Sequence, residues 1–124
     1  MKKLYESGED YLETIKILIE QKGIVLSVDI ANHMGFSKAS VSRAVKILSE
    51  NGFIIVNKGG SIVFTELGFA RASQIHDRHL TIADYLQNVL GVPASVADAD
   101  ACRIEHVISP ETFDAIKETV KKER

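Results

Sequence analysis

The 124-residue sequence contains one cysteine, and it has no apolar run that approaches the roughly 18 residues needed to span a bilayer. A single cysteine excludes an intramolecular disulfide framework, so Cys102 is a buried thiol, a reactive thiol or a metal ligand. The opening residues, Met1 to Lys3, lead into acidic sequence and not into the apolar stretch of a signal peptide. We therefore expect a cytoplasmic protein that has no membrane partner.

No internal repeat or low-complexity segment is visible, and the composition is that of an ordinary globular protein. Hydrophobic residues make up 45% of the chain and charged residues 26%, which is far from the profile of a disordered chain. The length fits one compact domain, or a small domain with an appended oligomerisation element. Because a monomer of this size buries only a modest core, dimerisation is plausible.

A strong positive charge is also missing, since the net charge is −2. The charges are spread unevenly along the chain, however. Segment 36–64 has four basic residues and one acidic residue, whereas the segments on either side of it are net negative. Because a binding surface responds to its local field, 36–64 is the part of the chain that can face phosphates favourably.

Three helices are predicted in the first 50 residues. Apolar residues recur at helical spacing in segments 8–22, 28–34 and 38–50, and a glycine follows each segment. Side chains that can cap the starts of these helices are Ser7 with Asp10, Ser27 and Ser37.

A β-hairpin is predicted next, from two runs rich in Ile, Val and Phe at 53–56 and 61–64. The glycines between the two runs permit the positive φ of a tight turn. Three further helices are expected. Thr65 can cap one that runs to about Leu90, Pro93 and Ser95 open another to about Ile108, and Ser109 with Pro110 can cap a last one to about Lys122. The predicted fold class is mainly α with a small β-hairpin wing.

The second and third helices have the spacing of a helix-turn-helix. Ala31 allows the two helices to approach, Gly35 makes the turn, and Val41 packs on the inward-facing side of the third helix. Three helices followed directly by a hairpin are the order of a winged helix. The sequence therefore predicts a winged helix-turn-helix module.

A polar and basic stripe remains on the third helix once the core positions are assigned. Such a stripe suits the major groove of DNA, where arginine can bond guanine bidentately, and a basic hairpin tip can meet phosphate or the minor groove. The alternative is an ordinary solvated helix face. The candidate DNA-binding residues are Ser37, Lys38, Ala39, Ser40, Ser42, Arg43, Lys46 and Lys58.

Cys102, Glu105 and His106 stand at i, i+3 and i+4 in the helix predicted to end at Ile108, so their side chains project from one face. Thiolate, carboxylate and imidazole together suit a first-row transition metal, whereas Ca²⁺ or Mg²⁺ would require oxygen ligands alone. This spacing predicts a transition-metal site.

Further ligands could come from elsewhere in the chain. Asp10 and Glu13 stand at i, i+3 in the first helix, and His79 lies midway along the fourth. His76 and Asp98 are weaker candidates. Each residue taken alone has a structural alternative as a capping acid, a solvated acid or a surface histidine, but together they favour a metal site.

At these residues the chain resembles the family of metal-dependent transcriptional regulators that includes the diphtheria toxin repressor and the manganese transport regulator. The resemblance covers nearly the whole chain. The segments that carry it are Glu9-Asp10-Tyr11-Leu12-Glu13, Arg78-His79 and Asp100-Ala101-Cys102-Arg103-Ile104-Glu105-His106-Val107-Ile108-Ser109.

The resemblance implies a DNA-binding domain over 1–64 and a helical metal-binding and dimerisation domain over 65–124. It also implies the shorter, two-domain form of the family. Some iron-responsive members continue into a third, SH3-like domain beyond the region that this sequence matches. The implied function is that of a transcriptional repressor and not an enzyme, which binds a palindromic operator as a homodimer when loaded with metal and so controls metal homeostasis. The metal ligands carried over are Asp10, Glu13, His79, Cys102, Glu105 and His106.

These ligands come from both predicted domains, so a bound metal would join them and fix the spacing of the two reading helices in a dimer. The resemblance points to Mn²⁺ or Fe²⁺, with Co²⁺ or Zn²⁺ possible. Asp10 resembles the manganese branch, Cys102 favours softer metals, and Ala83 with Asp98 departs from the ancillary site of the iron branch. Two rivals are a winged-helix regulator independent of metal and a small metalloenzyme.

Overall fold

The computed structural model describes residues 6–123 and confirms a mainly α-helical chain with one β-hairpin. The first five residues of the predicted domain 1–64, including Met1 to Lys3, lie outside the described part. The elements are α1 (Glu6–Lys22), α2 (Ser27–Met34), α3 (Lys38–Glu50), β1 (Ile54–Val56), β2 (Ile62–Phe64), α4 (Glu66–Asp84), the π-helical turn η1 (Tyr85–Val89), α5 (Ala94–Ile104) and α6 (Pro110–Glu123). The chain divides into two compact units between Ser73 and Gln74, inside α4.

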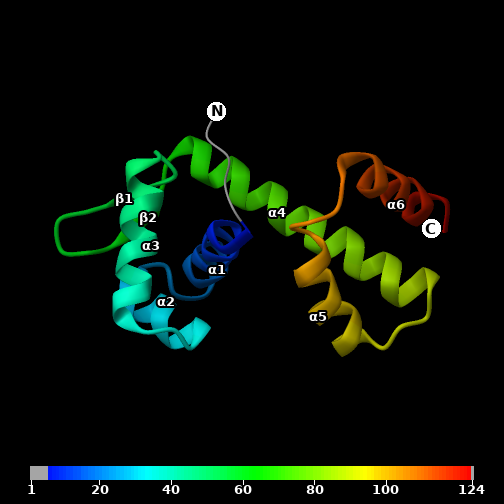
Figure 1. Ribbon diagram of the computed structural model, residues 1–124, viewed down its shortest axis with the longest axis horizontal. Helices are drawn as coiled ribbons and strands as arrows, with labels where there is room; N and C mark the ends of the chain where they lie inside the picture. The colour runs from blue at the N-terminus through cyan, green and yellow to red at the C-terminus, as the bar shows by residue number, and fades with distance from the viewer. Residues whose placement is uncertain (1–5, 124) are drawn as a thin grey trace. The chain divides into compact units, whose positions relative to one another are not determined.

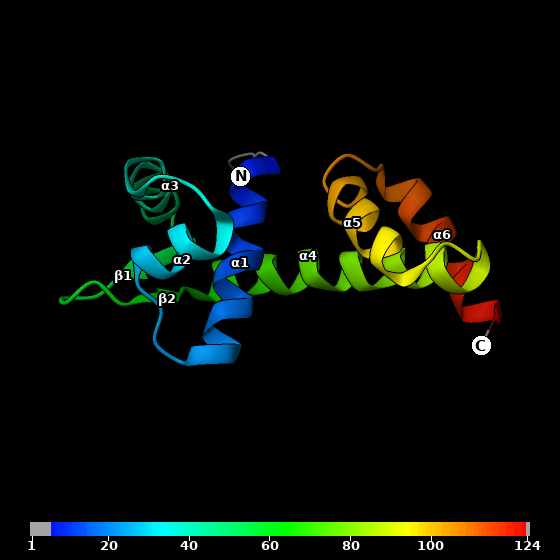
Figure 2. The same ribbon diagram turned by 90° about the horizontal axis from the view of Figure 1, so that it is seen from below.

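The first unit is a winged helix, with α1, α2 and α3 followed by the hairpin (Figure 1). β1 and β2 are antiparallel, with Ile55 opposite Val63, and in both views the hairpin extends beyond the helices (Figures 1 and 2). Burial of each large apolar side chain in this core contributes about 1.5–3 kcal/mol. The largest fully buried ones are Leu12, Ile15, Val25, Ile30, Val41, Leu48, Ile54 and Ile62.

Two of the predicted helix caps are wrong. Ser7 lies inside α1, and Ser27 is the first residue of α2. The extended backbone of Leu26 makes it the N-cap of α2, and its N–H donates to the Asp29 carboxylate at 2.8 Å. An acid at the third helical position accepts from the N–H of the N-cap residue, whereas a capping serine accepts from an N–H two or three residues ahead of it. The Asp29 bond therefore favours Leu26 as the N-cap, and the helix starts one residue earlier than predicted.

Thr65 caps α4 as predicted and also ties this helix to the hairpin. Its Oγ1 accepts a hydrogen bond from Gly68 N at 3.0 Å and donates to the Gly52 carbonyl oxygen at 2.6 Å, with the Phe53 carbonyl oxygen 3.1 Å away. Gly68 packs so closely here that an added Cβ would lie 1.7 Å from the Phe53 carbonyl oxygen. The start of α4 is therefore fixed against the wing by backbone-to-backbone packing that only glycine permits.

The second unit contains the rest of α4, η1, α5 and α6 (Figure 1). Its buried apolar side chains are Ile75, Ile82, Ala97, Ala101 and Val120. The helix predicted to run regularly to Leu90 is α-helical only to Asp84, and η1 follows it. No helix formed by residues 6–123 has both the length and the apolar character to cross a membrane.

α5 ends at Ile104, although the sequence predicted a helix to Ile108. The N–H groups of Val107 and Ile108 both donate to the Ile104 carbonyl oxygen, at 3.1 Å each, which closes a turn. Pro110 begins α6, and the residue before a proline is excluded from the helical region by the proline ring. The chain must therefore leave the helix before Ser109, whose Oγ then caps α6 at Thr112 N as predicted.

Candidate metal centre and nucleic-acid interface

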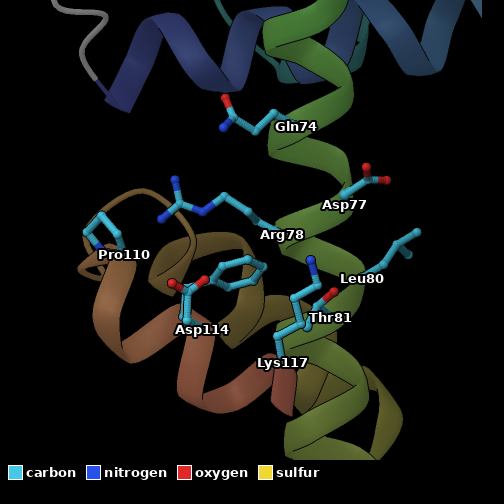
Figure 3. A pocket seen from close by; sticks show the side chains of 9 residues that line it. Gln74, Asp77, Arg78, Leu80, Thr81, Pro110, Asp114 and Lys117 are labelled. Atoms are coloured by element: carbon cyan, nitrogen blue, oxygen red, sulfur yellow. The ribbon is translucent and has the colours of Figure 1, made fainter. Parts of the chain in front are cut away.

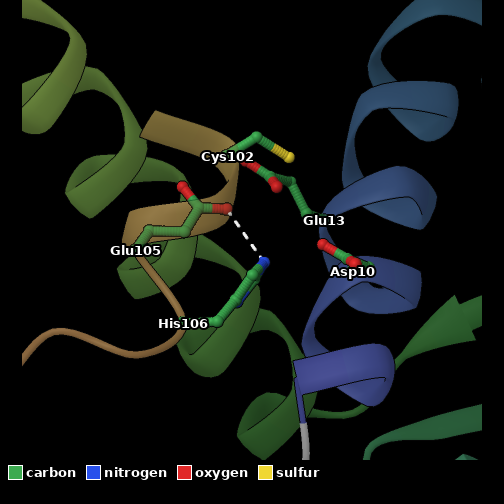
Figure 4. Close-up of side chains that lie close together, drawn as sticks. All are labelled: Asp10, Glu13, Cys102, Glu105 and His106. Atoms are coloured by element: carbon green, nitrogen blue, oxygen red, sulfur yellow. Dashed lines mark ion pairs between the residues drawn. The ribbon is translucent and has the colours of Figure 1, made fainter. Parts of the chain in front are cut away.

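Cys102, Glu105 and His106 bring three different ligand types together in the second unit (Figure 4). Each offers one ligand atom within 4.8 Å of those of the other two. Cys102 is exposed on the last turns of α5, whereas the side chains of Glu105 and His106 are each only 1% exposed. Glu105 and His106 lie in the turn after α5, so the three are close although the predicted helix ends early.

Glu105 provides a test of whether these residues suit a metal. Its Oε1 is buried and has no hydrogen-bond partner among the described residues, and the nearest ion-pair partner, His106 Nε2, lies 3.3 Å away. An unsatisfied buried carboxylate oxygen costs free energy, which a cation would offset. Thiolate, carboxylate and imidazole are donors for first-row transition metals. The residues therefore fit a divalent ion of this class.

His79 contacts Glu105 through its other carboxylate oxygen. His79 Nδ1 lies 3.1 Å from Glu105 Oε2, and His79 Nε2 lies 2.7 Å from Asp98 Oδ1. His79 is not among the mutually close ligand atoms, and neither are the weaker candidates Asp98 and His76. In this structure His79 orients a candidate ligand, while the Asp98 carboxylate bonds the far side of the imidazole.

Asp10 and Glu13 form the candidate set of the first unit. They stand one turn apart on α1, and each offers a carboxylate oxygen within 4.8 Å of the other (Figure 4). Glu13 is buried, at 8% exposure. Two neighbouring carboxylates on one helix face repel each other unless a cation or proton compensates, so their arrangement suits cation binding.

The sequence reasoning missed an ion pair beside Asp10. The Glu9 side chain is 8% exposed, and its Oε2 accepts from Arg71 Nη2 at 3.0 Å and from Arg71 Nε at 3.3 Å. This pair holds α1 against α4 within the first unit. A signal was present, because Glu9 lies close in sequence to the buried residues Tyr11 and Leu12, but its partner lies 62 residues away.

The reading face of α3 is organised by its cap. Ser37 Oγ accepts from Ser40 N at 3.1 Å and donates to Ser40 Oγ at 3.0 Å, and Arg43 Nη2 lies 3.4 Å from Ser40 Oγ. Gly35 takes the left-handed conformation, with φ +72°, that ends α2. The other candidate residues are exposed, namely Lys38, Ala39, Ser42 and Lys46 on α3 and Lys58 at the hairpin turn.

Tyr11 lies beneath this face. Burial raises the pKa of its hydroxyl, and the positive charge of Arg43 opposes part of that rise. Its ring also packs against Phe36, with centroids 6.1 Å apart. The helix that carries Asp10 and Glu13 therefore reaches the vicinity of Arg43 inside one compact unit.

Both halves of the chain match family models. Residues 3–61 match the model described as "Iron dependent repressor, N-terminal DNA binding domain", and residues 65–123 match "Iron dependent repressor, metal binding and dimerisation domain". The two matches leave only short segments of the chain uncovered.

Curated relatives are similar over most of the chain. An uncharacterised helix-turn-helix transcriptional regulator of Methanocaldococcus jannaschii is 30% identical over 118 residues, which cover 94% of each chain. The transcriptional regulator MntR of Salmonella typhimurium is 36% identical over 107 residues, which cover 86% of this chain and 68% of that protein.

Solved structures extend this similarity to the fold. The manganese regulator SloR has a TM-score of 0.80 at 27% identity, covering 92% of this chain, and IdeR of T. acidophilum has a TM-score of 0.82 at 25% identity, covering 98%. This chain spans 53% and 56% of those two chains, so it corresponds to about half of each.

Proposed function

The chain belongs to the iron-dependent repressor family of metal-dependent transcriptional regulators, and on this premise we propose that it represses transcription when loaded with a divalent transition metal. In that state it binds a palindromic operator as a homodimer and controls metal homeostasis. The observation that carries the proposal is the buried Glu105 oxygen that lacks a hydrogen-bond partner beside a thiol and an imidazole. The proposed role is regulatory and not enzymatic. Because the proposed partner is DNA, we also propose that the protein is located in the cytoplasm.

The proposed domains are 1–64 for DNA binding and 65–124 for metal binding and dimerisation, a proposal that the family-model matches over 3–61 and 65–123 support. The proposed contacts to DNA are the candidate residues of α3 and the hairpin. Arg43, already oriented toward Ser40, is the best suited to a bidentate contact with guanine. The proposed metal ligands are Asp10, Glu13, His79, Cys102, Glu105 and His106.

His79 has two compatible roles in this proposal. Its imidazole can be a ligand itself, and its hydrogen bond to Glu105 Oε2 orients a second ligand. Outer hydrogen bonds of this kind fix ligand geometry and contribute to metal affinity.

The proposed mechanism rests on the distribution of the ligands between the domains. Asp10 and Glu13 belong to the domain that reads DNA, and Cys102, Glu105 and His106 belong to the other. A bound divalent cation would supply the positive charge that offsets the repulsion among these carboxylates and the thiolate. With the ligands drawn to one centre, the reading helices of a dimer would be held about 34 Å apart, one turn of DNA.

Metal and operator must then strengthen each other's binding by the same factor, typically about 1–3 kcal/mol of coupling. For the metal itself we propose Mn²⁺ or Fe²⁺. The carboxylates suit Mn²⁺, and Cys102 suits the softer ions, including Co²⁺ and Zn²⁺.

Operator binding titrated with Mn²⁺, Fe²⁺, Co²⁺ and Zn²⁺ at one pH and one salt concentration tests the function, with metal stoichiometry measured in parallel. We expect tight binding with at least one of these metals and its loss after chelation. Equal operator affinity with and without chelator would instead support a regulator independent of metal. Hydrolytic activity without metal-dependent DNA binding would support a metalloenzyme.

A further inference from the structure

Arg78 precedes His79 on α4 and reaches the segment that follows α5. Its Nη2 donates a hydrogen bond to the Ile108 carbonyl oxygen at 3.2 Å, and its guanidinium carbon lies 5.4 Å from the centre of the Phe113 ring. Figure 3 shows the side chain extending from α4 toward Pro110 at the start of α6. One side chain thus contacts the point at which α5 has ended and α6 begins.

Glu105 and His106 lie in the turn immediately before that point. The upstream end of the turn is fixed by α5, because Glu105 N donates to the Ala101 carbonyl oxygen at 3.0 Å. The downstream end is held by Arg78 at Ile108. Cys102, in contrast, lies inside α5, where the helix itself holds its backbone.

The guanidinium is retained here despite a cost in hydrogen bonding. Arg78 Nε is buried and has no hydrogen-bond partner among the described residues, which is unfavourable for a donor. A cavity of about 620 Å³ lies beside it between α4 and α6, lined also by Asp77, Thr81 and Lys117 (Figure 3). Buried donors without partners are uncommon and are found at functional positions.

We propose that Arg78 is a positioning residue that fixes the turn carrying Glu105 and His106, and so sets two metal ligands without touching the metal. The inference rests on the proposed metal site. It adds a residue that acts through the backbone, next to His79, which acts on the Glu105 side chain. Charge alone does not suffice, because lysine lacks the planar fork that allows a carbonyl contact and ring stacking together.

Co²⁺ binding to the 124-residue chain tests this inference, since the absorption of bound Co²⁺ reports its ligands. We expect Arg78→Met to bind Co²⁺ about 10-fold more weakly, the range of effects seen when residues that support metal ligands are changed. Arg78→Lys should bind with intermediate affinity. The visible d–d bands should change, because Glu105 and His106 move, while the near-ultraviolet charge-transfer band of the Cys102 thiolate persists.

Lys117→Met is the matched control, because it removes a basic residue that lines the same cavity but is exposed and lies on α6. It should leave Co²⁺ affinity and both sets of bands unchanged. Equal losses in Lys117→Met and Arg78→Met would overturn the inference, as would wild-type affinity and d–d bands in Arg78→Met. If circular dichroism shows that Arg78→Met does not fold, Arg78→Lys decides: wild-type affinity and bands overturn the inference, and an intermediate loss supports it.

The proposed function fails differently. If the wild-type chain binds no Co²⁺, both proposals fall. If it binds Co²⁺ and the Arg78 variants behave as expected, but no metal strengthens operator binding, Arg78 keeps its positioning role and the proposed repressor mechanism alone is wrong.

Discussion

His79 Nδ1 lies 3.1 Å from Glu105 Oε2, across the second unit from α4 to the turn after α5. This contact uses one oxygen of a carboxylate that is 1% exposed, while the other oxygen, Oε1, has no hydrogen-bond partner among the described residues and lies 3.3 Å from His106 Nε2. The imidazole therefore fixes the orientation of the carboxylate and leaves its second oxygen directed to the candidate metal centre.

Glu105→Gln should abolish the metal response while the fold remains intact. The amide keeps the shape of the side chain but loses the negative charge on which metal coordination depends. Operator binding with and without added Mn²⁺ or Fe²⁺ checks this, with Glu111→Gln, an exposed acid of the same unit, as the control. A Glu105→Gln protein that still needs metal to bind its operator would contradict the site assignment.

Arg43→Ala should weaken specific operator binding by about 1–3 kcal/mol if Arg43 contacts a base bidentately. The reason is its exposed position on the reading face and its orientation toward Ser40. Binding isotherms at one fixed salt concentration measure the effect, because phosphate contacts depend on salt. Lys121→Ala removes an equal charge from α6 and should have little effect; an unchanged affinity in Arg43→Ala removes that residue from the reading face.

Arg71→Met should destabilise the first unit by about 1–3 kcal/mol, less than a fully buried pair because the Arg71 side chain is 24% exposed. Glu9→Gln should lower the free energy of unfolding by less, because the charge that then lacks its ion-pair partner is Arg71, which is the more exposed of the two side chains. Denaturant unfolding of both variants and of the double variant measures this. The double variant should lose less than the two single losses combined; simple additivity would show that the pair is not coupled.

Gly68→Ala should destabilise the winged helix by at least about 2 kcal/mol, because the new methyl group would overlap the Phe53 carbonyl oxygen and backbone must move. Thermal unfolding followed by circular dichroism is a direct measure. A melting temperature equal to that of the wild type would show that α4 does not pack on the wing as described.

Asp29 should contribute stability that is lost in acid. The pKa of its carboxyl is lowered, first by the hydrogen bond from Lys22 and then by the Leu26 N–H. A lowered pKa means that the stabilisation is fully present above the ordinary value of 3.8 and disappears as the pH falls through the lower folded value. The stability gap between wild type and Asp29→Asn, measured by urea unfolding, should therefore close below about pH 3.8.

Lys22→Met offers the matched comparison, because it removes the main cause of the shift while the carboxyl stays. In a Lys22→Met background, the difference in stability between the protein that keeps Asp29 and its Asp29→Asn variant should depend less on pH. A gap that is constant from pH 6 to pH 2 would rule out this role for Asp29.

The sequence was sufficient to predict those features that residues close together along the chain determine. Ser37, Thr65 and Ser109 cap helices as predicted because each side-chain oxygen reaches a backbone N–H three residues ahead. The spacing of Cys102, Glu105 and His106 likewise brings their ligand atoms together in the structure.

It was insufficient where an alternative local bond or a distant partner competes. Asp29, and not Ser27, satisfies the start of α2. The apolar spacing of Ile104 and Ile108 looks helical, but Pro110 forces the chain out of the helix. The bond from His79 to Glu105 and the pair of Glu9 with Arg71 join residues 26 and 62 positions apart, which no periodicity reveals.

The π-helical turn η1 has a consequence for how the length of the chain can vary. Leu90 N donates to the Tyr85 carbonyl oxygen, five residues back, so this turn holds one residue more than an α-helical turn. In a homologue with one residue fewer in Tyr85–Val89, α4 could continue as a regular α-helix through this segment. The residues that correspond to Ile82 and Ala97 would then still be buried in the same core. The end of α4 is thus a place where a single-codon insertion or deletion can be absorbed as a change of helical winding, without a loop.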